Sequence, residues 1–262
     1  MLDELTNAAL AAGAAILKIY DREDFATRVK QDGSPVTEAD ALAEELITQR
    51  LVAAYPEIPI VAEEAASEGR IPATASRFFL VDPLDGTKEF LNRNGDFTVN
   101  IALIEDGHPT VGVVYAPAHG DIYAGQVGQG ARHARVEGGK IGEWAPIAAR
   151  EPASALAVVA SRSHLSPETS EFIARFQVSD MVSAGSSLKF CRVAAGGADL
   201  YPRLGRTMEW DTAAGDAVLR FAGGAVRTMD GQPLRYGKRN QSDDTDFANP
   251  WFVASGPFDP FA

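Results

Sequence analysis

Apolar residues in the first part of the chain recur at a helical period. The period covers residues 2–20 and residues 38–55, the second segment being ended by Pro56. It predicts an amphipathic helix in each segment. The core face of the first helix is predicted at Leu5, Ala9, Ala12, Ile16 and Ile19. The core face of the second is predicted at Leu42, Leu46, Ile47 and Leu51.

Runs of apolar residues predict strands around these helices. A short strand is expected in "FATRVK", residues 25–30, followed by a loop that leads into the second helix. The runs "IPIVAEE" and "FFLVD" predict buried strands that end in acidic residues. Alternating and apolar stretches with glycine and proline turns over residues 97–125 predict a β-meander.

Beyond a segment of weak periodicity, about residues 138–153, strands and helices alternate. Strands are expected at 156–160 and 198–203, and helices at 166–176, 186–197 and 211–224. This pattern predicts a mixed α/β fold in which helices are layered on sheets. We expect a single unit over residues 1–262, with an N-terminal lobe of about 1–145 and a C-terminal lobe of about 146–262.

Composition and charge limit the class of protein and of partner. The chain has 262 residues, of which 45% are hydrophobic and 23% charged, as in ordinary globular proteins. Its net charge of −12 and pI near 4.8 argue against a nucleic-acid partner. Asp3 and Glu4 lie where a secretory signal would be basic, so we expect neither a signal nor an integral membrane span. Cys191 is the sole cysteine, which rules out an intramolecular disulfide and favours a reducing cytosol.

Two aspartates mark the end of one predicted strand, in the stretch "LVDPLDGTKEF". Asp82 and Asp85 flank Pro83, which is expected to end the strand. Like charges at this spacing repel, and a turn needs only one such residue beside its proline and glycine. We therefore expect a cation between the aspartates, with backbone N–H groups of Gly86 and Thr87 available to an oxyanion beside them.

Further acids occur where α/β folds collect ligand groups. They are Glu63 and Glu64 after one strand and Asp211 at the start of a helix. Asp40, in "SPVTEAD", is a further candidate. Hard oxygen ligands favour magnesium, manganese or calcium over zinc. Taken singly, each acid also has a structural interpretation, because Asp40 and Asp211 could cap helices and Glu63 could be a solvated strand end. Taken together, the acids favour a site for divalent cations that meet a phosphate.

Several motifs resemble those of one known family. In chain order they are "SPVTEAD", "EE", "DPLDGTKEF" and "WDTAAG", and they span nearly the whole chain. They resemble the inositol monophosphatase-like superfamily of metal-dependent, lithium-sensitive phosphatases. Further stretches, "FTVNIALI", "SRSH", "GSSLKFC" and "EWDTAAG", are most similar to its CysQ-type 3′(2′),5′-bisphosphate nucleotidases. The resemblance implies a layered α/β/α/β/α fold and hydrolysis of adenosine 3′,5′-bisphosphate (PAP) to AMP and phosphate, with the sulfated form PAPS as a further substrate.

The resemblance also implies a set of metal ligands. Glu63, Asp82 and the backbone carbonyl of Leu84 would bind one ion, and Asp82, Asp85 and Asp211 would bind a second. Asp40 would reach a third, weaker ion through water. Thr87 and Glu63 would orient the attacking water. The implied cofactor is Mg²⁺, as two or three ions, with Mn²⁺ as a substitute.

Substrate contacts are implied at phosphate-binding and cationic positions. They are Gly86, Thr87, Ser161, His164, Ser187, Lys189, Arg203 and Asp211. The cations would face the second phosphate of the nucleotide, because an acidic protein can hold that group only with local positive charge. The alternative interpretation of these residues is ordinary surface charge and helix capping.

Competing functions remain open at this point. The nearest is a phosphatase of the same superfamily that acts on inositol monophosphate or another sugar phosphate. A second, of another class, is a metal- or nucleotide-binding regulator without turnover. The expected partner is a phosphorylated small molecule in the cytosol, with a peripheral position at the inner face of the membrane as an alternative and the oligomeric state left open.

Overall fold

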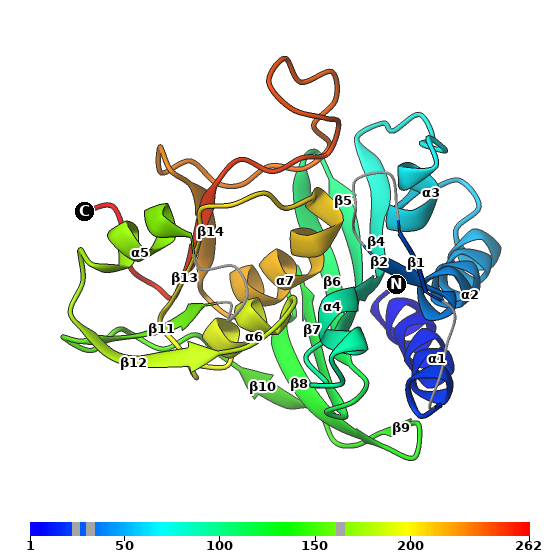
Figure 1. The fold of residues 1–262 in the computed structure, drawn as a ribbon, viewed down its shortest axis with the longest axis horizontal. Coiled ribbons are helices and arrows are strands. Elements are labelled where there is room, and N and C mark those ends of the chain that lie inside the picture. Colours follow the sequence, from blue (N-terminus) through cyan, green and yellow to red (C-terminus); the bar gives the residue numbers. More distant parts are fainter. Residues whose placement is uncertain (23–26, 30–34, 161–165) are drawn as a thin grey trace.

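The computed structural model describes residues 1–22, 27–29, 35–160 and 166–262. Helices and sheets alternate in layers from right to left in Figure 1. The layer on the right holds α1 (Leu2–Tyr20) and α2 (Glu38–Ala54), and a first sheet follows it. The central helices α6 (Leu188–Ala194) and α7 (Glu209–Phe221) separate this sheet from a second one, which α5 (Pro167–Ile173) covers on its far side. This arrangement confirms the layered α/β/α/β/α fold.

The first sheet is antiparallel except at one edge. Its strand order is β10-β8-β7-β6-β5-β4-β3, with β9 paired to β8 and β3 parallel to β4. The strands are β3 (Ile60–Ala62), β4 (Arg77–Asp85), β5 (Thr98–Glu105), β6 (His108–Ala116), β7 (Asp121–Gln126), β8 (Gly130–Glu137), β9 (Lys140–Ile141) and β10 (Ala145–Ile147). Because β5, β6 and β7 follow one another in chain and sheet alike, the predicted β-meander is confirmed. A separate antiparallel pair consists of β1 (Thr27–Val29) and β2 (Pro35–Thr37).

The second sheet has the order β12-β11-β13-β15-β14. Its strands are β11 (Leu156–Ala160), β12 (Val178–Ser183), β13 (Leu200–Arg203), β14 (Ala225–Thr228) and β15 (Phe252–Ser255). β11 runs parallel to both of its neighbours, whereas β15 is antiparallel to β13 and β14. The first sheet thus ends at Ile147 and the second begins at Leu156, while the division into lobes near residue 145 stays a prediction.

Apolar cores fill the spaces between the layers. Strand β4 contributes to two of them, because successive side chains of a strand point to opposite faces. Phe79 and Val81 pack with α1 and α2, whereas Phe78 and Leu80 pack with the central helices and the second sheet. A smaller core joins the second sheet to α5. Strand β4, which ends in the paired aspartates, is therefore buried on both faces.

The predicted core face is confirmed for α1 and wrong in part for α2. The predicted residues of α1 are all buried. On α2, Ile47 and Leu51 are buried, but Leu42 is 40% exposed. The helix is rotated so that Asp40 and Glu44 point inward with Ala39 and Ala43. A hydrophobic period cannot detect this rotation, since the buried positions include two carboxylates.

Some predicted boundaries near the acidic residues are also corrected. Strand β2 occupies residues where only a loop was expected, and the predicted strand over 25–30 lies partly outside the described residues. Glu63 and Glu64 begin a short helix, α3 (Glu63–Ser67), instead of ending a strand. Strand β4 continues past Pro83 to Asp85, because a register shift accommodates the proline. A further short helix, α4 (Thr87–Leu91), follows.

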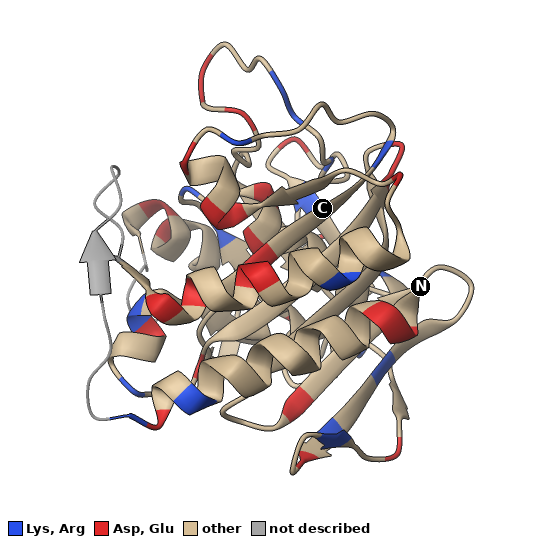
Figure 2. Cartoon of the chain, turned by 90° about the vertical axis from the view of Figure 1, so that its right-hand side faces the viewer, with Lys and Arg blue, Asp and Glu red and all other residues tan. Residues whose placement is uncertain are grey.

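No helix in the described ranges has the length and apolar character needed to cross a membrane. The side of the molecule formed by α1 and α2 faces the viewer in Figure 2. The Lys and Arg residues described on this side lie scattered among Asp and Glu.

Helix α7 packs closely against the first sheet at Gly112 and Gly125, and a substitution can test this contact. A Cβ atom on Gly112 would lie 2.5 Å from Ala217 Cβ and 2.7 Å from the Ala214 carbonyl oxygen. We therefore expect Gly112→Ala to push α7 away and lower the free energy of unfolding by about 1–3 kcal/mol. Gly142→Ala is the control, because the nearest atom to its Cβ would be 3.4 Å away. Equal melting temperatures for the two variants would contradict the expectation.

Candidate active site

Asp82 and Asp85 share one face of β4 because the strand carries a bulge between them. Asp82 pairs with Asn100 of β5, and Asp85 pairs with Thr98. The three-residue step on β4 thus opposes a two-residue step on β5. Positions two apart on a regular strand share a face, whereas positions three apart do not. The extra residue therefore brings both carboxylates to the side of the sheet that faces α7.

Asp85 is held by donors from β5 and from the start of α6. Its Oδ2 accepts the backbone N–H of Ser187 at 2.7 Å and the Asn100 side-chain amide at 3.2 Å. Loss of solvent raises the pKa of Asp85 to about 6, although the charge of Lys189 and these hydrogen bonds act in the opposite direction. Ser187 Oγ donates to the Asp211 carbonyl oxygen at 2.7 Å. The loop before α6 therefore ties the two aspartate-bearing segments together.

Asp82 is a deeply buried carboxylate of the site, with 2% of the residue exposed. Its Oδ1 accepts the backbone N–H of Leu84 at 3.1 Å. Burial raises its pKa well above the usual range, and repulsion from Glu63, Asp85 and Asp211 raises it further. Such a group stays charged only when positive charge is brought to it.

Asp211 reaches the same space from the first turn of α7. Its Oδ2 accepts the backbone N–H of Met208 at 2.8 Å, which fixes the carboxylate at the helix N-terminus. Burial, followed by repulsion from Asp85 and Glu63, raises its pKa well above the usual range. The fully buried Glu209 holds this turn in place, because it accepts the backbone N–H groups of Gly237 and Lys238 at 2.6 and 2.9 Å.

Thr87 and Asp40 form a second polar pair beside the carboxylates. Thr87 Oγ1 lies 3.3 Å from Asp40 Oδ1 and 3.5 Å from the Leu84 carbonyl oxygen. Asp40 Oδ2 accepts both the N–H and the hydroxyl of Thr37, so the predicted capping of α2 is present. The preceding Gly86 has a φ of 92°, and a Cβ on it would lie 2.1 Å from Ser186 Oγ. This position therefore requires glycine.

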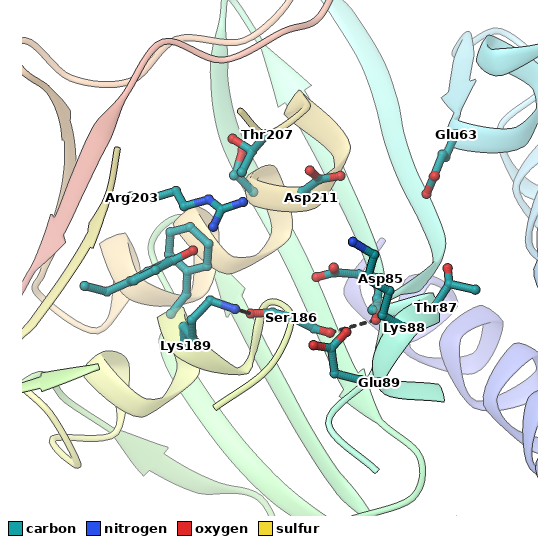
Figure 3. A pocket seen from close by; sticks show the side chains of 14 residues that line it. Glu63, Asp85, Thr87, Lys88, Glu89, Ser186, Lys189, Arg203, Thr207 and Asp211 are labelled. Atoms are coloured by element: carbon teal, nitrogen blue, oxygen red, sulfur yellow. Dashed lines mark hydrogen bonds between the residues drawn. The ribbon is translucent and has the colours of Figure 1, made fainter. Parts of the chain in front are cut away.

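A pocket of about 280 Å³ opens over these groups. Its charged and hydroxyl-bearing lining residues include Glu63, Asp85, Thr87, Ser186, Lys189, Arg203, Thr207 and Asp211. Figure 3 shows Lys189 and Arg203 on one side of the pocket and Glu63 on the other, with Asp85 and Asp211 between them. The pocket thus has a cationic side at Lys189 and Arg203 and an acidic side at Glu63, Asp85 and Asp211, with Lys88 and Glu89 of α4 also in its lining.

The Lys189 side chain is buried on the cationic side of the pocket, next to an aromatic ring and a backbone carbonyl group. Its Nζ donates to the Ser186 carbonyl oxygen at 2.7 Å and lies 5.5 Å from the centre of the Tyr201 ring. Burial lowers the pKa of Lys189 to about 8, and the Asp85 carboxylate limits the fall. Arg203 is held near the pocket by a hydrogen bond to the Arg206 carbonyl oxygen.

The acidic side suits divalent cations with oxygen ligands. Its donors are carboxylates together with the Leu84 carbonyl, the set that Mg²⁺, Mn²⁺ and Ca²⁺ prefer. The raised pKa values of Asp82 and Asp211 are the physical sign of acidic groups that lack enough compensating charge. Among the described residues, no three His, Cys, Asp or Glu side chains already converge as the ligands of one ion do.

The pocket is lined by the predicted site residues Glu63, Asp85, Gly86, Thr87, Lys189, Arg203 and Asp211. Asp40, Asp82, Leu84 and Ser187 do not line it but lie next to residues that do. Ser161 and His164 lie outside the described residues. The alternative role of Ser187 as a helix cap is wrong, since its side chain makes no capping bond and contacts Asp211 instead. The roles of all these residues in metal and substrate binding stay predictions.

Sequence reasoning missed several residues that shape the site. Asn100 could have been suspected as a polar residue inside the apolar strand "FTVNIALI". Ser186 has a φ of 47°, which is unusual for a residue other than glycine, and its Oγ lies 2.8 Å from the Asp85 carbonyl oxygen. Thr207 and Tyr201 carry no local signal, because only the packing of the second sheet brings them to the pocket.

Comparisons with known proteins agree with this fold. The sequence model of the inositol monophosphatase family matches residues 1–249. The 3′(2′),5′-bisphosphate nucleotidase CysQ of Escherichia coli O6:H1 is 43% identical over 256 residues, which cover 97% of this chain and 99% of that protein. The crystal structure of CysQ from Bacteroides thetaiotaomicron superimposes with a TM-score of 0.81 at 37% identity, covering 98% of this chain and 97% of that one. An inositol monophosphatase from Anabaena has a TM-score of 0.74 at 27% identity, covering 98% and 90%. The chain therefore belongs to the inositol monophosphatase family of metal-dependent phosphatases.

Proposed function

We propose that this protein is a 3′(2′),5′-bisphosphate nucleotidase that hydrolyses adenosine 3′,5′-bisphosphate to AMP and phosphate with Mg²⁺. The observation that carries the proposal is the division of the pocket into an acidic and a cationic side. A substrate with two phosphates matches this division, because one phosphate can meet the metal-binding side while the other meets Lys189 and Arg203. The Escherichia coli relative is a 3′(2′),5′-bisphosphate nucleotidase, which supports a substrate of this class.

The metal-binding residues in this proposal are Glu63, Asp82, Asp85 and Asp211, with the carbonyl of Leu84. Bound divalent ions would neutralise phosphate charge and would lower the pKa of a water molecule so that it can attack at neutral pH. The chain contributes fixed positions for these ligands through the β4 bulge, the Ser187 N–H and the Met208 N–H. Mg²⁺ is the proposed ion, and Mn²⁺ has the same ligand preference.

Thr87 is proposed to orient the attacking water together with Glu63. The Thr87 hydroxyl donates to Asp40, which leaves the lone pairs of Oγ1 available to accept a hydrogen bond from that water. Hydrolysis then forms a bond between the water oxygen and phosphorus and breaks the bond from phosphorus to the ribose 3′ oxygen. The proton that the water loses ends on that oxygen. Lys189 and Arg203 hold the 5′-phosphate and so fix which phosphate faces the water.

A reducing cytosol stays the expected compartment, since a chain with one cysteine, Cys191, cannot form an intramolecular disulfide. The peripheral membrane position is an untested alternative, as is the use of PAPS as a second substrate.

Metal binding predicts a pH-dependent stability. A carboxyl group whose pKa is higher in the folded than in the unfolded state stabilises the fold below its unfolded pKa of about 3.9, and this contribution is lost as the pH rises through the folded pKa. For Asp85 the folded value is about 6. We expect the melting temperature of the metal-free protein to fall between about pH 5 and pH 7, and Mg²⁺ to raise it more at the higher pH.

Calorimetry of the protein with Mg²⁺ and with a chelator, across this pH range, measures both effects. Asp85→Asn is the matched variant, because it removes the titrating group and should flatten the pH dependence. A stabilisation by Mg²⁺ that is independent of pH would contradict the expectation.

The proposed role of Thr87 predicts a loss of turnover without a loss of metal binding. Thr87→Val keeps the shape of the side chain but removes the hydroxyl, so kcat should fall roughly 100-fold. The Mg²⁺ concentration for half-maximal activity should change little. Thr110→Val is the control, since that hydroxyl contacts Glu105 at 2.8 Å on another strand. A melting temperature lowered with kcat intact would instead assign Thr87 to stability alone.

The cationic side predicts a selective loss on the bisphosphate. Lys189→Met or Arg203→Met should cost about 2 kcal/mol in kcat/KM for adenosine 3′,5′-bisphosphate, the scale of a charge-assisted hydrogen bond. Hydrolysis of adenosine 3′-monophosphate should barely change, because that substrate lacks the second phosphate. Arg192→Met, an exposed position on α6, is the control.

Phosphate release from both nucleotides and from inositol monophosphate tests the proposal as a whole. Preference of the unmodified protein for inositol monophosphate would overturn the nucleotidase assignment. Equal losses on both nucleotides would assign Lys189 and Arg203 to the common phosphate site or to the fold.

A further inference from the structure

Helix α3, which begins at the proposed metal ligand Glu63, lacks a cap of its own. The residue before it, Ala62, has extended N-cap geometry but no side chain that can accept a hydrogen bond. The first N–H groups of any helix have no partner within the helix. A helix of five residues, Glu63–Ser67, is also too short to be stable by itself. The position of Glu63 must therefore be fixed from outside α3.

Glu44 of α2 supplies the missing acceptors. Its Oε2 accepts the backbone N–H of Glu64 at 2.7 Å, and its Oε1 accepts that of Ala65 at 3.0 Å. Each oxygen of one carboxylate thus binds one N–H of the first turn. These partners explain why Glu44 is only 9% exposed, because carboxylates are rarely buried without them. A charged acceptor at a helix N-terminus is also favoured by the helix dipole.

The same face of α2 also fixes the other group proposed to orient the water. Asp40 and Glu44 are four residues apart, so they lie one above the other on one side of the helix. Asp40 accepts the Thr87 hydroxyl at 3.3 Å, and Glu44 holds the helix that starts with Glu63. Figure 1 shows α3 next to α2 on the right-hand side of the molecule. One rigid helix of 17 residues therefore sets the spacing between Thr87 and Glu63.

We propose that Glu44 is a positioning residue, which caps α3 from α2 and thereby holds Glu63 at the distance from Thr87 that metal binding and water attack require. The inference rests on the proposed function, because it assigns Glu63 to the metal. Glu44 itself touches backbone N–H groups and acts only through Glu63. A displacement of about 1 Å in such a ligand is enough to reduce turnover strongly, and partners of this kind commonly change metal affinity 10- to 100-fold.

Glu44→Gln tests the proposal with almost no change in shape. The amide nitrogen cannot accept a hydrogen bond, so one N–H of α3 loses its partner. We expect Mn²⁺ binding, measured by calorimetry on the otherwise unchanged protein, to weaken about tenfold or more. At saturating metal, kcat should fall by a similar factor, while KM for adenosine 3′,5′-bisphosphate should stay within about twofold because Lys189 and Arg203 are untouched. Glu45→Gln is the control, since Glu45 is the next residue of α2 and is exposed.

A rescue variant separates capping from a general effect on stability. Ala62→Ser places a hydroxyl at the N-cap of α3, where it can accept an N–H of the first turn. Combined with Glu44→Gln, it should recover a large part of the Mn²⁺ affinity and of kcat. If Glu44→Gln does not fold, Glu44→Asp, which withdraws the carboxylate by one methylene group, provides the same comparison.

The outcomes distinguish this inference from the proposed function. Unchanged Mn²⁺ affinity and kcat in Glu44→Gln, with only a lower melting temperature, would overturn the positioning role while leaving the nucleotidase intact. A double variant without any recovery would overturn capping as its cause. Absence of phosphate release by the unmodified protein would instead overturn the proposed function, and the Mn²⁺ titration would still measure the effect of Glu44 on Glu63.

Discussion

The mutual repulsion of buried carboxylates is the constraint on which the site depends. Asp82, Asp85 and Asp211 lie around one pocket, and loss of solvent raises the pKa of each; repulsion from neighbouring carboxylates raises the pKa of Asp82 and Asp211 further. The protein offsets part of the cost with N–H donors from Ser187 and Met208. Hydrogen bonds of this kind stabilise the charged form but do not neutralise it. The remaining negative charge is what suits the pocket to the divalent cations proposed to bind there.

The layered fold answers this constraint by placing opposite charges on different layers. Glu63, Asp82 and Asp85 belong to the first sheet and the short helices at its edge, whereas Lys189 and Arg203 belong to α6 and the second sheet. Asp211, on α7 between the sheets, faces both groups. The close packing of α7 on Gly112 and Gly125 fixes how near it comes to the bulge of β4. Small displacements between these layers would change the geometry of the pocket, because its two sides are not joined in one element.

Helix α2 shows how the site affects the packing of the scaffold. Its inward face includes Asp40 and Glu44, while Leu42 remains exposed. An ordinary surface helix would turn leucine toward the core and the acids toward water. The exception is stabilised by specific partners, namely Thr37 and Thr87 for Asp40 and the first turn of α3 for Glu44. Local departures of this kind from the hydrophobic pattern are expected near functional sites.

The sequence by itself determined the features that depend on residues close along the chain. The core face of α1, the β-meander and the capping of α2 could all be predicted, because helical and strand periods and turn chemistry act over a few residues. The family resemblance added the set of site residues by matching motifs in chain order.

Only the tertiary structure decided how these pieces meet. The bulge that turns Asp82 and Asp85 to one face is defined by the register with β5, and the bond from Ser187 to Asp85 joins residues 102 positions apart. Glu44 points inward because the N-terminus of α3, which has no cap from its own N-cap residue, lies against it. Such contacts depend on which layers pack together and in which register. No local sequence pattern predicts them, because they stabilise the fold only once segments distant in the chain are in contact.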